Sequence, residues 1–462
     1  EYFHADNILA PHFLHRLYSS IHEHGQFICH HLEHGGGLRT NHYLSDITGL
    51  LFVAGYCPFF RESREWLDFS IRELVAEMAN QVYADGCHFE ASTCYHRLAL
   101  ELFFFATLLV VVRERKSGGE SYRQAAERVF GSDYLERLHR MFVAVLHLLK
   151  PNGRMPQIGD NDSGRFLVLG TRDVLDMRYL LSFGAVFFDE PQLKVEEFGF
   201  SEDALWLFGR GGYDTWSSLT GRSVETIDSR SFPQAGWHVL RQGHNYCLVS
   251  CGPNGPNGKG GHAHNDKLSI ELVLDGHDVV VDPGTYTYTP WPDRRNRFRS
   301  TDYHNTVQID GCEQNGPLNG DLFSLPDRMN IRSARLTEIP GQTTFEGEID
   351  YAGIVHKRTL RLDRQSRQCR IDDHISCSRS FGAETRFHLS PDVIVRGTGI
   401  HEKETGRRLA TFEIEGGGTK VQTYDYSPQY GLRVEAPCIC VRIPVAAREA
   451  AVTTIFSAET TR

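Results

Sequence analysis

The chain has 462 residues, of which 40% are hydrophobic and 23% are charged, and its formal net charge is −10. This length exceeds what one hydrophobic core usually holds, so we expect a globular protein with two domains. The negative charge argues against a nucleic-acid partner, but not against an acidic substrate, because a site can be locally basic. The longest apolar run, 102–112, is too short to span a bilayer and predicts a buried helix.

Cysteine usage and the start of the chain say little about the compartment. The 11 cysteines are odd in number and lack a framework spacing, so a disulfide scaffold is not expected. Cys438 and Cys440 lie one residue apart on an expected strand and should point the same way as buried thiols. The sequence starts without methionine and shows no signal-peptide pattern.

The first part of the chain predicts helices. In the stretch 64–86 the apolar side chains recur on one helical face, and Asp85-Gly86 ends the pattern. The members of that face are Leu67, Ile71, Leu74, Val75, Met78 and Val82. Further helices are expected over 11–33, 43–56, 95–115, 134–150 and 173–188. Consecutive helices joined by short polar turns favour a helical hairpin array or toroid.

After about residue 200 the pattern changes to short alternating runs, which predict strands. These runs cover 237–242, 246–251, 268–282, 304–311, 354–363 and 368–377. Asp275-Gly276 between apolar runs is a strong hairpin signal, and many short strands indicate a large antiparallel sandwich. The predicted fold class is α+β multidomain, with a helical domain over 1–195 and a β-sandwich over 196–462.

One hairpin carries most of the metal-ligating residues. His262 and His264 lie two residues apart, Asp282 ends the hairpin, and His304 begins the next expected strand. Imidazoles with one carboxylate fit a zinc-like site, or the carboxylate orients a histidine. Hydrogen-bonded histidines at strand ends are the structural alternative.

Four further stretches carry polar chemistry. Asn41 and His42 open an apolar helix, where Asn41 could simply be a cap. Ser92 or Thr93 caps a helix whose first turn holds Tyr95 and His96, and a helix N-terminus favours anions. The third stretch is a polar loop with Asp160, Asp162 and Arg165, which we interpret as structural with some substrate contact. The fourth is a basic stretch with Arg294, Arg295, Arg297 and Arg299.

Six pieces in order, "NHYLS", "EASTCYH", "IGDND.GR", "GGHAHNDKLS", "VVDPGTY" and "HNTVQIDG", resemble the heparinase II/III-like polysaccharide lyases. The resemblance implies an (α/α) toroid followed by a β-sandwich, and β-elimination at a 4-linked uronic acid. Because family toroids are usually longer than about 190 residues, we expect an incomplete toroid or a missing N-terminal piece. A bacterial periplasmic or secreted location is expected, and a cytoplasmic one stays open.

The resemblance also assigns roles. Asn41 would bind the uronate carboxylate, Tyr95 would be the catalytic tyrosine, and His262 would be the active-site histidine. His264, Asp282 and His304 would be ligands of a divalent metal, zinc by ligand type, in a structural role. The chemistry of elimination, rather than the resemblance, adds further roles. His42 and His262 would help Asn41 neutralise the uronate carboxylate, and His96, Arg294, Arg295 and Arg299 would contact the polyanion.

Elimination needs a base and an acid. Tyr95 is expected to be the acid, or both acid and base. Otherwise Tyr286, Tyr288 or His42 is the second base, and Tyr288 is favoured among the three. The structural alternative is that these tyrosines are only aromatics at a strand end. The expected function is a lyase acting on an anionic uronate polysaccharide, such as heparan sulfate, hyaluronan or a bacterial exopolysaccharide. The alternatives are a metal-dependent polysaccharide hydrolase and a non-catalytic polyanion-binding protein on the same fold.

Overall fold

The computed structural model describes residues 9–34, 37–116, 119–318, 320–446 and 448–459. The chain divides into two compact units. Unit 1 consists of Glu1–Val82 and Leu98–His139, and unit 2 consists of Tyr83–Arg97 and Arg140–Arg462. The chain therefore leaves unit 1, enters unit 2 for a short segment, returns, and leaves again.

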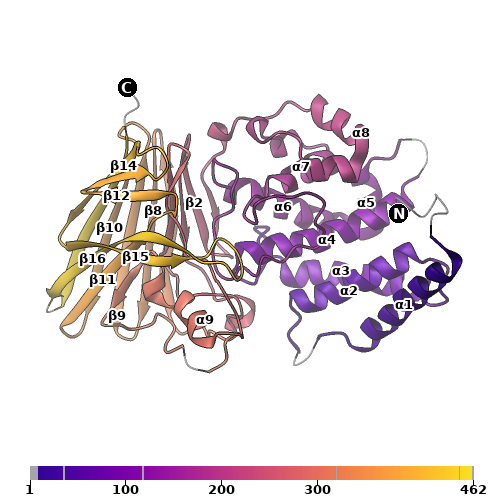
Figure 1. Cartoon of the computed structure of the whole chain (residues 1–462), viewed down its shortest axis with the longest axis horizontal. Helices are drawn as coiled ribbons and strands as arrows, with labels where there is room; N and C mark the ends of the chain where they lie inside the picture. Colours follow the sequence, from indigo (N-terminus) through magenta and orange to yellow (C-terminus); the bar gives the residue numbers. More distant parts are fainter. Residues whose placement is uncertain (1–8, 35–36, 117–118, 319, 447, 460–462) are drawn as a thin grey trace. The chain divides into compact units, whose positions relative to one another are not determined.

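Unit 1 is helical. It holds α1 (Pro11–His30), α2 (Asn41–Tyr56), α3 (Ser63–Gln81), most of α4 (Thr93–Glu114), α5 (Tyr122–Phe130) and the first half of α6 (Ser132–Leu148). Helices α1, α2 and α3 pack in sequence (Figure 1). The buried side of α2 is apolar, as in Leu44, Ile47 and Leu51. Helices are present near the predicted positions 11–33, 43–56, 64–86, 95–115 and 134–150, and α5 is an addition.

The buried face of α3 differs from the predicted one. Trp66, Leu74 and Met78 are buried, but so are Glu77 and Gln81. Arg39 Nη1 lies 2.9 Å from Glu77 Oε1, and the Gln81 amide donates to the carbonyl of Thr40 at 3.0 Å. A buried carboxylate needs such partners, so a row of polar side chains can occupy a helix face that an apolar pattern alone would not select.

Two helix starts carry site residues. In α2 the side chain of Thr40 accepts the backbone N–H of His42, so Thr40 is the cap and Asn41 is the first helical residue. In α4 the Ser92 hydroxyl accepts the N–H of Tyr95 at 3.1 Å, which confirms Ser92 as a cap. Among the helices of the described ranges, α4 is long and apolar enough to cross a membrane by length and composition, but 83% of its apolar window is buried.

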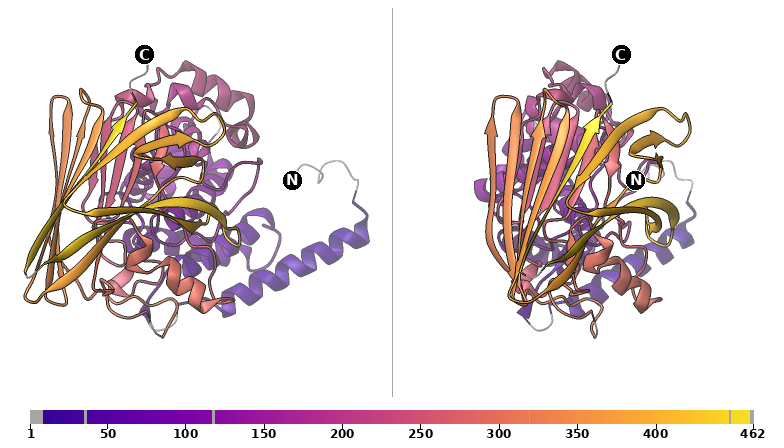
Figure 2. Two further views of the ribbon diagram at one scale, coloured as in Figure 1. Left: turned by 60° about the vertical axis from the view of Figure 1, so that its left-hand side comes forward. Right: turned by 90° about the vertical axis from the view of Figure 1, so that its left-hand side faces the viewer.

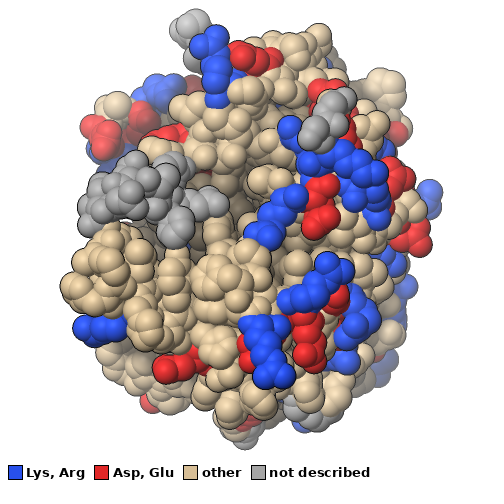
Figure 3. Space-filling model, turned by 90° about the vertical axis from the view of Figure 1, so that its right-hand side faces the viewer, with Lys and Arg blue, Asp and Glu red and all other residues tan. Residues whose placement is uncertain are grey.

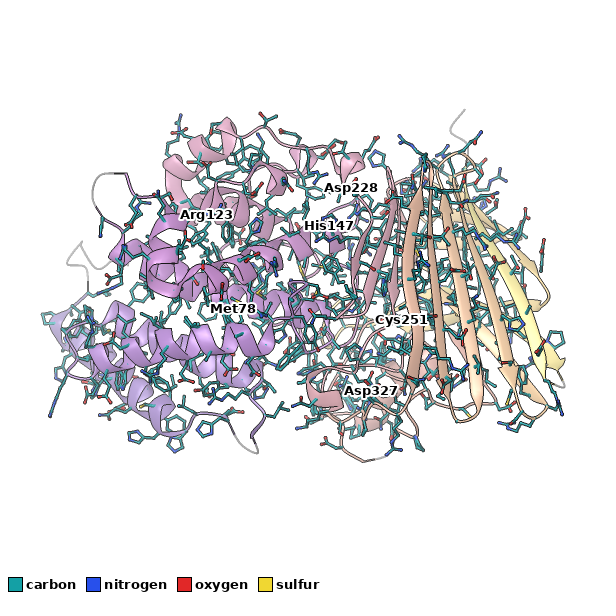
Figure 4. All side chains as sticks on the ribbon, turned by 180° about the vertical axis from the view of Figure 1, so that it is seen from behind. Met78, Arg123, His147, Asp228, Cys251 and Asp327 are labelled. Atoms are coloured by element: carbon teal, nitrogen blue, oxygen red, sulfur yellow. The ribbon has the colours of Figure 1, made fainter. Side chains whose placement is uncertain are left out.

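Unit 2 begins with helical elements. It holds the end of α6, α7 (Arg178–Phe188), α8 (Glu202–Ser218) and the short α9 (Pro292–Phe298). The C-terminal carbonyls of α6 are covered by the sheet that follows, because the Tyr246 hydroxyl donates to Leu148 O at 2.8 Å and Arg241 to His147 O at 3.1 Å. His147 in turn contacts the Asp228 carbonyl at 3.1 Å (Figure 4). A cation at a helix C-terminus also offsets the helix dipole.

Three antiparallel sheets form the rest of the described unit. The five-stranded sheet, in order β1-β2-β3-β4-β5, contains Arg230–Phe232, Trp237–Gln242, Asn245–Ser250, Ile270–Leu274 and His277–Val280. The eight-stranded sheet, in order β12-β13-β14-β17-β10-β9-β8-β7, contains Val393–Arg396, Gly399–Glu402, Arg408–Glu415, Glu449–Ala458, Gln368–Cys377, Ile354–Asp363, Gln342–Tyr351 and Asn330–Ile339. The four-stranded sheet, in order β15-β16-β11-β6, contains Gly418–Tyr426, Val434–Ala446, Phe381–His388 and Val307–Ile309. Figure 2 shows the long strands stacked as layers.

Much of this half follows the predicted pattern. Strands β2, β9 and β10 have the predicted limits, and Asp275-Gly276 forms the turn between β4 and β5. Both turn residues have positive φ, 49° and 79°, as a two-residue hairpin turn requires. Cys438 and Cys440 project from the same side of β16 with their Sγ atoms 3.7 Å apart, and every cysteine of the chain is a free thiol.

The change from helix to strand occurs later than residue 195. Helix α8 ends at Ser218 and the first strand begins at Arg230. By compactness, the segment 140–195 belongs to the same unit as the sheets. The domain limits 1–195 and 196–462 stay a prediction of the sequence.

Charged side chains on the surface are mixed in sign. Figure 3 shows Lys and Arg beside Asp and Glu on one face of the molecule. Exposed pairs one helical turn apart, such as Arg64–Asp68 and Arg210–Asp214, are part of this pattern. Such pairs add little stability, but they keep a chain of net charge −10 from presenting one acidic field.

Candidate active site

Three segments of unit 2 that are distant in sequence cross at Gly159. Its backbone has φ +67°, and a Cβ atom there would lie 2.6 Å from the carbonyl oxygens of both Ala91 and His262. The Asp160 N–H donates to His262 O at 2.9 Å, and the Ser92 hydroxyl donates to Asp160 O at 2.6 Å. Only glycine permits this approach, which brings the start of α4, the loop at 160 and the segment at 262 together.

Tyr95 lies in the middle of this crossing. Its ring stacks on the His262 imidazole, with centroids 3.7 Å apart and planes 19° from parallel. Its hydroxyl donates to Asp162 Oδ2 at 3.0 Å and lies 3.2 Å from the Tyr288 hydroxyl. Burial raises the pKa of Tyr95 well above its usual value, and the nearby charges of Asp162 and Asp160 raise it further. Tyr95 is therefore a protonated phenol at neutral pH.

Asp160 is a fully buried carboxylate that joins three cationic or polar partners. It receives two hydrogen bonds from the Arg295 guanidinium. Its oxygens also lie 2.9 Å from His262 Nδ1 and 2.8 Å from His264 Nε2. Burial alone would raise the pKa of Asp160, but the Arg295 charge and the histidine contacts hold it well below its usual range. The carboxylate is thus a fixed negative charge at the centre of the site.

His262 lies between two carboxylates. Nδ1 contacts Asp160, and Nε2 is 3.6 Å from Glu90 Oε2, which is too long for a good hydrogen bond. Burial lowers the pKa of His262, but the Asp160 hydrogen bond and the charges of Glu90 and Asp160 outweigh it, so the pKa is raised. A carboxylate on Nδ1 fixes the tautomer in which Nε2 carries the free lone pair.

The tyrosines after the hairpin point to different places because the backbone turns sharply at Tyr286. The Thr287 N–H donates to Thr285 O at 2.8 Å, and Tyr286 has φ +64°, the signature of a rare, strained γ-turn. Tyr288 reaches the Tyr95 hydroxyl. Tyr286 instead stacks against Trp291 at 5.8 Å. Of the two tyrosines predicted as second bases, only Tyr288 lies beside Tyr95.

The residues predicted as metal ligands lie close together but do not form a three-ligand set. Asp282 Oδ2 is 2.7 Å from His304 Nδ1, and the rings of His264 and His304 are 5.2 Å apart. His264 Nδ1 and His304 Nε2 are buried and have no hydrogen-bond partner among the described residues. In the ranges that the structure describes, no group of three His, Cys, Asp or Glu side chains is arranged to hold a metal ion. Asp282 here orients His304.

Three predicted polyanion contacts are corrected by their surroundings. Both ring nitrogens of His96 contact backbone groups, the N–H of His88 and the carbonyl of Met141, each at 3.2 Å, so this buried ring is structural. Arg299 is buried and donates to the carbonyls of residues 321, 322 and 324. Arg295 is held by Asp160. Arg294 is exposed, 3.8 Å from Asp425, and is the one of the four that stays accessible.

Asn41 and His42 belong to unit 1. Asn41 is buried in the first turn of α2, and His42 is exposed with Nδ1 2.8 Å from Glu33 Oε2. Their roles stay predictions of the resemblance.

The carboxylates of the site are hard to recognise in the sequence. The pattern predicts a mainly structural loop at Asp160 and Asp162, and nothing local singles out Glu90. Their partners are remote: Asp160 and Arg295 are 135 residues apart in the chain. The signal was present in the piece "IGDND.GR", whose two aspartates flank one residue, and in "EASTCYH", which opens with Glu90.

Solved structures and curated proteins resemble the chain. A crystal structure of heparinase III aligns over 98% of this chain and 66% of its own, with a TM-score of 0.74 and 18% identity, which confirms the predicted toroid-plus-sandwich fold class. The heparin-sulfate lyase of Pedobacter heparinus is 26% identical over 308 residues, 65% of this chain and 40% of that protein. The heparin-sulfate lyase of Bacteroides thetaiotaomicron is 25% identical over 327 residues, which are 67% of this chain and 42% of that protein. The chain thus spans about two fifths of these curated relatives.

Two family models match the chain in the expected order. The heparinase II/III N-terminus matches residues 1–177. The heparinase II/III-like C-terminal model matches residues 225–457, half of the chain, and this range holds His262, Asp282, Tyr288 and Arg295. The chain therefore belongs to the heparinase II/III-like family.

Proposed function

We propose that the chain is a polysaccharide lyase that cleaves a uronic-acid-containing polysaccharide by β-elimination. In this reaction the C5–H bond and the C4–O bond break, a C4–C5 double bond forms, and the proton from C5 leaves while another reaches the departing oxygen. The observation that carries the proposal is the stacked pair of Tyr95 and His262, each hydrogen-bonded to its own aspartate. Pure binding needs no such pair of proton-transfer groups.

Tyr95 is the acid in this scheme. Its phenol is protonated at neutral pH because burial and the Asp162 and Asp160 charges raise its pKa. A phenol with a raised pKa is not ionised at neutral pH, so it cannot accept the C5 proton, and it keeps its own proton until negative charge develops on the leaving oxygen. The pKa of Tyr288 is raised by burial and by the charge of Asp160 as well, so its phenolate is not favoured either.

His262 is the base. Its Nδ1 is held by Asp160, and its Nε2 lies 3.6 Å from Glu90 Oε2. The Asp160 hydrogen bond and the charges of Glu90 and Asp160 raise the pKa of His262, which makes the neutral imidazole a stronger general base. The histidine must be neutral to act, so activity rises as pH rises through its pKa. A cationic His262 that only neutralised the uronate carboxylate would give the opposite slope.

The substrate class is an anionic uronate polysaccharide. The relatives named heparin-sulfate lyases support a glycosaminoglycan such as heparan sulfate, and hyaluronan or a bacterial exopolysaccharide offers the same uronate. Asn41 is proposed to bind the uronate carboxylate, as the resemblance implies. A periplasmic or secreted location is proposed on the same ground.

A divalent metal, zinc by ligand type, is proposed at His264 and His304, with Asp282 orienting His304. The two unpartnered buried ring nitrogens fit this use, since imidazole nitrogen is a common zinc ligand. The metal would hold the segment before β4 to the start of β6 and would stabilise the fold rather than the transition state.

The first experiment follows the ultraviolet absorbance of the unsaturated uronate while the protein acts on heparan sulfate, hyaluronan, chondroitin sulfate and alginate. We expect absorbance to rise on at least one polymer, and Tyr95→Phe to lose at least roughly 10²-fold in kcat, the usual contribution of a positioned acid. A folded Tyr95→Phe protein with full activity would remove Tyr95 from the chemistry.

The same assay separates the alternatives. Reducing ends that appear without ultraviolet absorbance would show hydrolysis. Binding to the panel without any product would show a non-catalytic polyanion-binding protein.

A further inference from the structure

We propose that unit 2 carries a second sugar-binding surface beside the reacting groups, formed by Trp291, Tyr286, Arg294 and Arg433 and here called the Trp291 platform. It would hold sugar residues of the anionic polysaccharide next to the pair that reacts. The proposal rests on the proposed function for its choice of ligand, a chain of acidic sugars.

The platform is an exposed aromatic surface with a rigid support. Trp291 stands at the N-terminal end of α9 with 54% of its surface exposed. Its ring is parallel to that of Tyr286 within 1°, at 5.8 Å, and the Arg433 guanidinium lies 4.8 Å from the Tyr286 ring. A flat indole fits the C–H face of a sugar ring.

Its charges suit an acidic sugar. Arg433 pairs with Asp425, and Arg294 Nη1 lies 3.8 Å from the same carboxylate. Arg294, Arg433 and Asp425 together carry one net positive charge, next to Asp293 in the first turn of α9, and both arginines are exposed. The neighbouring Arg297 is paired with Asp302 and adds no further charge. Guanidinium groups bind carboxylates and sulfates through two hydrogen bonds.

The platform is continuous with the reacting groups. Tyr288 N–H donates to the Tyr430 hydroxyl at 3.1 Å, and Gly431 N–H donates to Tyr286 O at 2.7 Å, so one loop supports both tyrosines. Trp291 follows Tyr288 by three residues, a backbone reach of at most roughly 11 Å. A polymer that reacts at Tyr95 can therefore extend over Trp291.

The strained backbone at Tyr286 supports a functional use. A bulky residue with φ +64° in a γ-turn costs free energy. The turn places Tyr286 under Trp291 and Tyr288 beside Tyr95, two placements that a regular strand would not combine within three residues. The conformation is explained if both rings contact the same polysaccharide.

The test measures binding of heparan sulfate to the full chain by calorimetry. We expect Trp291→Ala to raise Kd roughly fivefold to tenfold, the loss of one well-placed aromatic contact, and Trp291→Phe to recover most of the affinity. The matched control is Trp206→Ala on α8, which removes a Trp that is 52% exposed and should leave Kd within twofold. An unchanged Kd for Trp291→Ala would overturn the platform.

The arginines are tested by salt dependence. Replacing Arg294 and Arg433 by glutamine should make the fall of affinity with salt shallower, because fewer counterion-releasing contacts remain. An unchanged slope would overturn their assignment. In the elimination assay, Trp291→Ala should lower kcat/KM for the polymer more than for a tetrasaccharide.

Failure of the platform and failure of the lyase function give different results. A protein that binds heparan sulfate but produces no unsaturated uronate would refute the elimination, while the Trp291→Ala comparison would still decide the platform. A wild-type protein that binds no polymer of the panel would refute the platform directly.

Discussion

Asp160 is the residue on which the chemistry of the site depends most. It fixes the His262 tautomer, compensates the buried Arg295 and contacts His264. The pKa of Asp160 is lower in the folded protein than its value of about 3.9 in the unfolded chain, so its ionised form stabilises the fold at any pH above that value. This stabilisation is lost only in strong acid, as the pH falls through the folded-state pKa. The site should therefore keep its charge pattern throughout the working range of pH.

Asp160→Asn should shift the acid limb of the kcat/KM profile to lower pH and lower kcat. Without the negative charge, burial dominates and the pKa of His262 falls, so the base is neutral at lower pH but weaker. The buried Arg295 would also lose its partner, at a cost of roughly 3–5 kcal/mol. The pH profile and urea unfolding measure the two effects.

Asp162→Asn is the matched control for that prediction. It removes the acceptor of Tyr95 and keeps the partner of His262, so the acid limb should stay in place. The pKa of Tyr95 should fall, since the Asp162 charge raises it, and the alkaline limb should move to lower pH. An acid limb that moves equally in both variants would contradict the assignment of His262 as the base.

At the scale of elements, the site depends on how closely three backbone segments approach. A methyl group at Gly159 would lie 2.6 Å from two carbonyl oxygens, and the backbone there has positive φ. Gly159→Ala should therefore lower the free energy of unfolding by roughly 2–3 kcal/mol and separate Tyr95 from His262. Gly276→Ala, where the φ is also positive but no atom lies within 4 Å, is the control. It should cost less and keep activity.

Metal removal is a prediction about the hairpin and the strand after it. If a metal is held by His264 and His304, elemental analysis should find close to one zinc per chain, and chelation should lower Tm before it lowers kcat. His304→Ala should abolish both the zinc and the effect of the chelator. If the purified protein contains no zinc and chelation leaves its Tm unchanged, the proposed metal site is wrong.

Regular elements could be predicted from sequence where the pattern is local. Strands β9 and β10 and the Asp275-Gly276 turn follow from alternation and turn chemistry over ten residues. The short α9 could not, because it begins at Trp291-Pro292 in a stretch with no helical period. The surroundings of His96 could not be predicted for another reason. Its place in the first turn of a helix follows from the local sequence, but the backbone groups that its ring contacts belong to His88 and Met141.

At the scale of the whole molecule, the helix-to-sheet boundary does not separate independent parts of unit 2. Lys150, before the boundary, is buried within 2.9 Å of Glu271 and 2.8 Å of Asp278, after it. The carbonyls at the end of α6 are likewise covered by Arg241 and Tyr246. These contacts join the segment 140–195 to the sheets within one unit.

A fragment of residues 196–462 should therefore lack a cooperative fold. It would leave Glu271, Asp278 and Arg295 buried without their opposite charges, each a cost of several kcal/mol. We expect calorimetry to show a broad transition or aggregation instead of a cooperative peak. A fragment 140–462 is the comparison, and equal cooperativity of the two fragments would contradict the argument.

The crossing at Gly159 has a consequence for recombination between relatives. A chimaera joined at residue 195 would take Tyr95, Gly159 and Asp160 from one parent and His262, His264 and Arg295 from the other. The hydrogen bonds that join these groups would then have to form between residues from two different parent proteins. Exchanging sandwiches alone would therefore transfer only part of the set of segments that meet at this carboxylate.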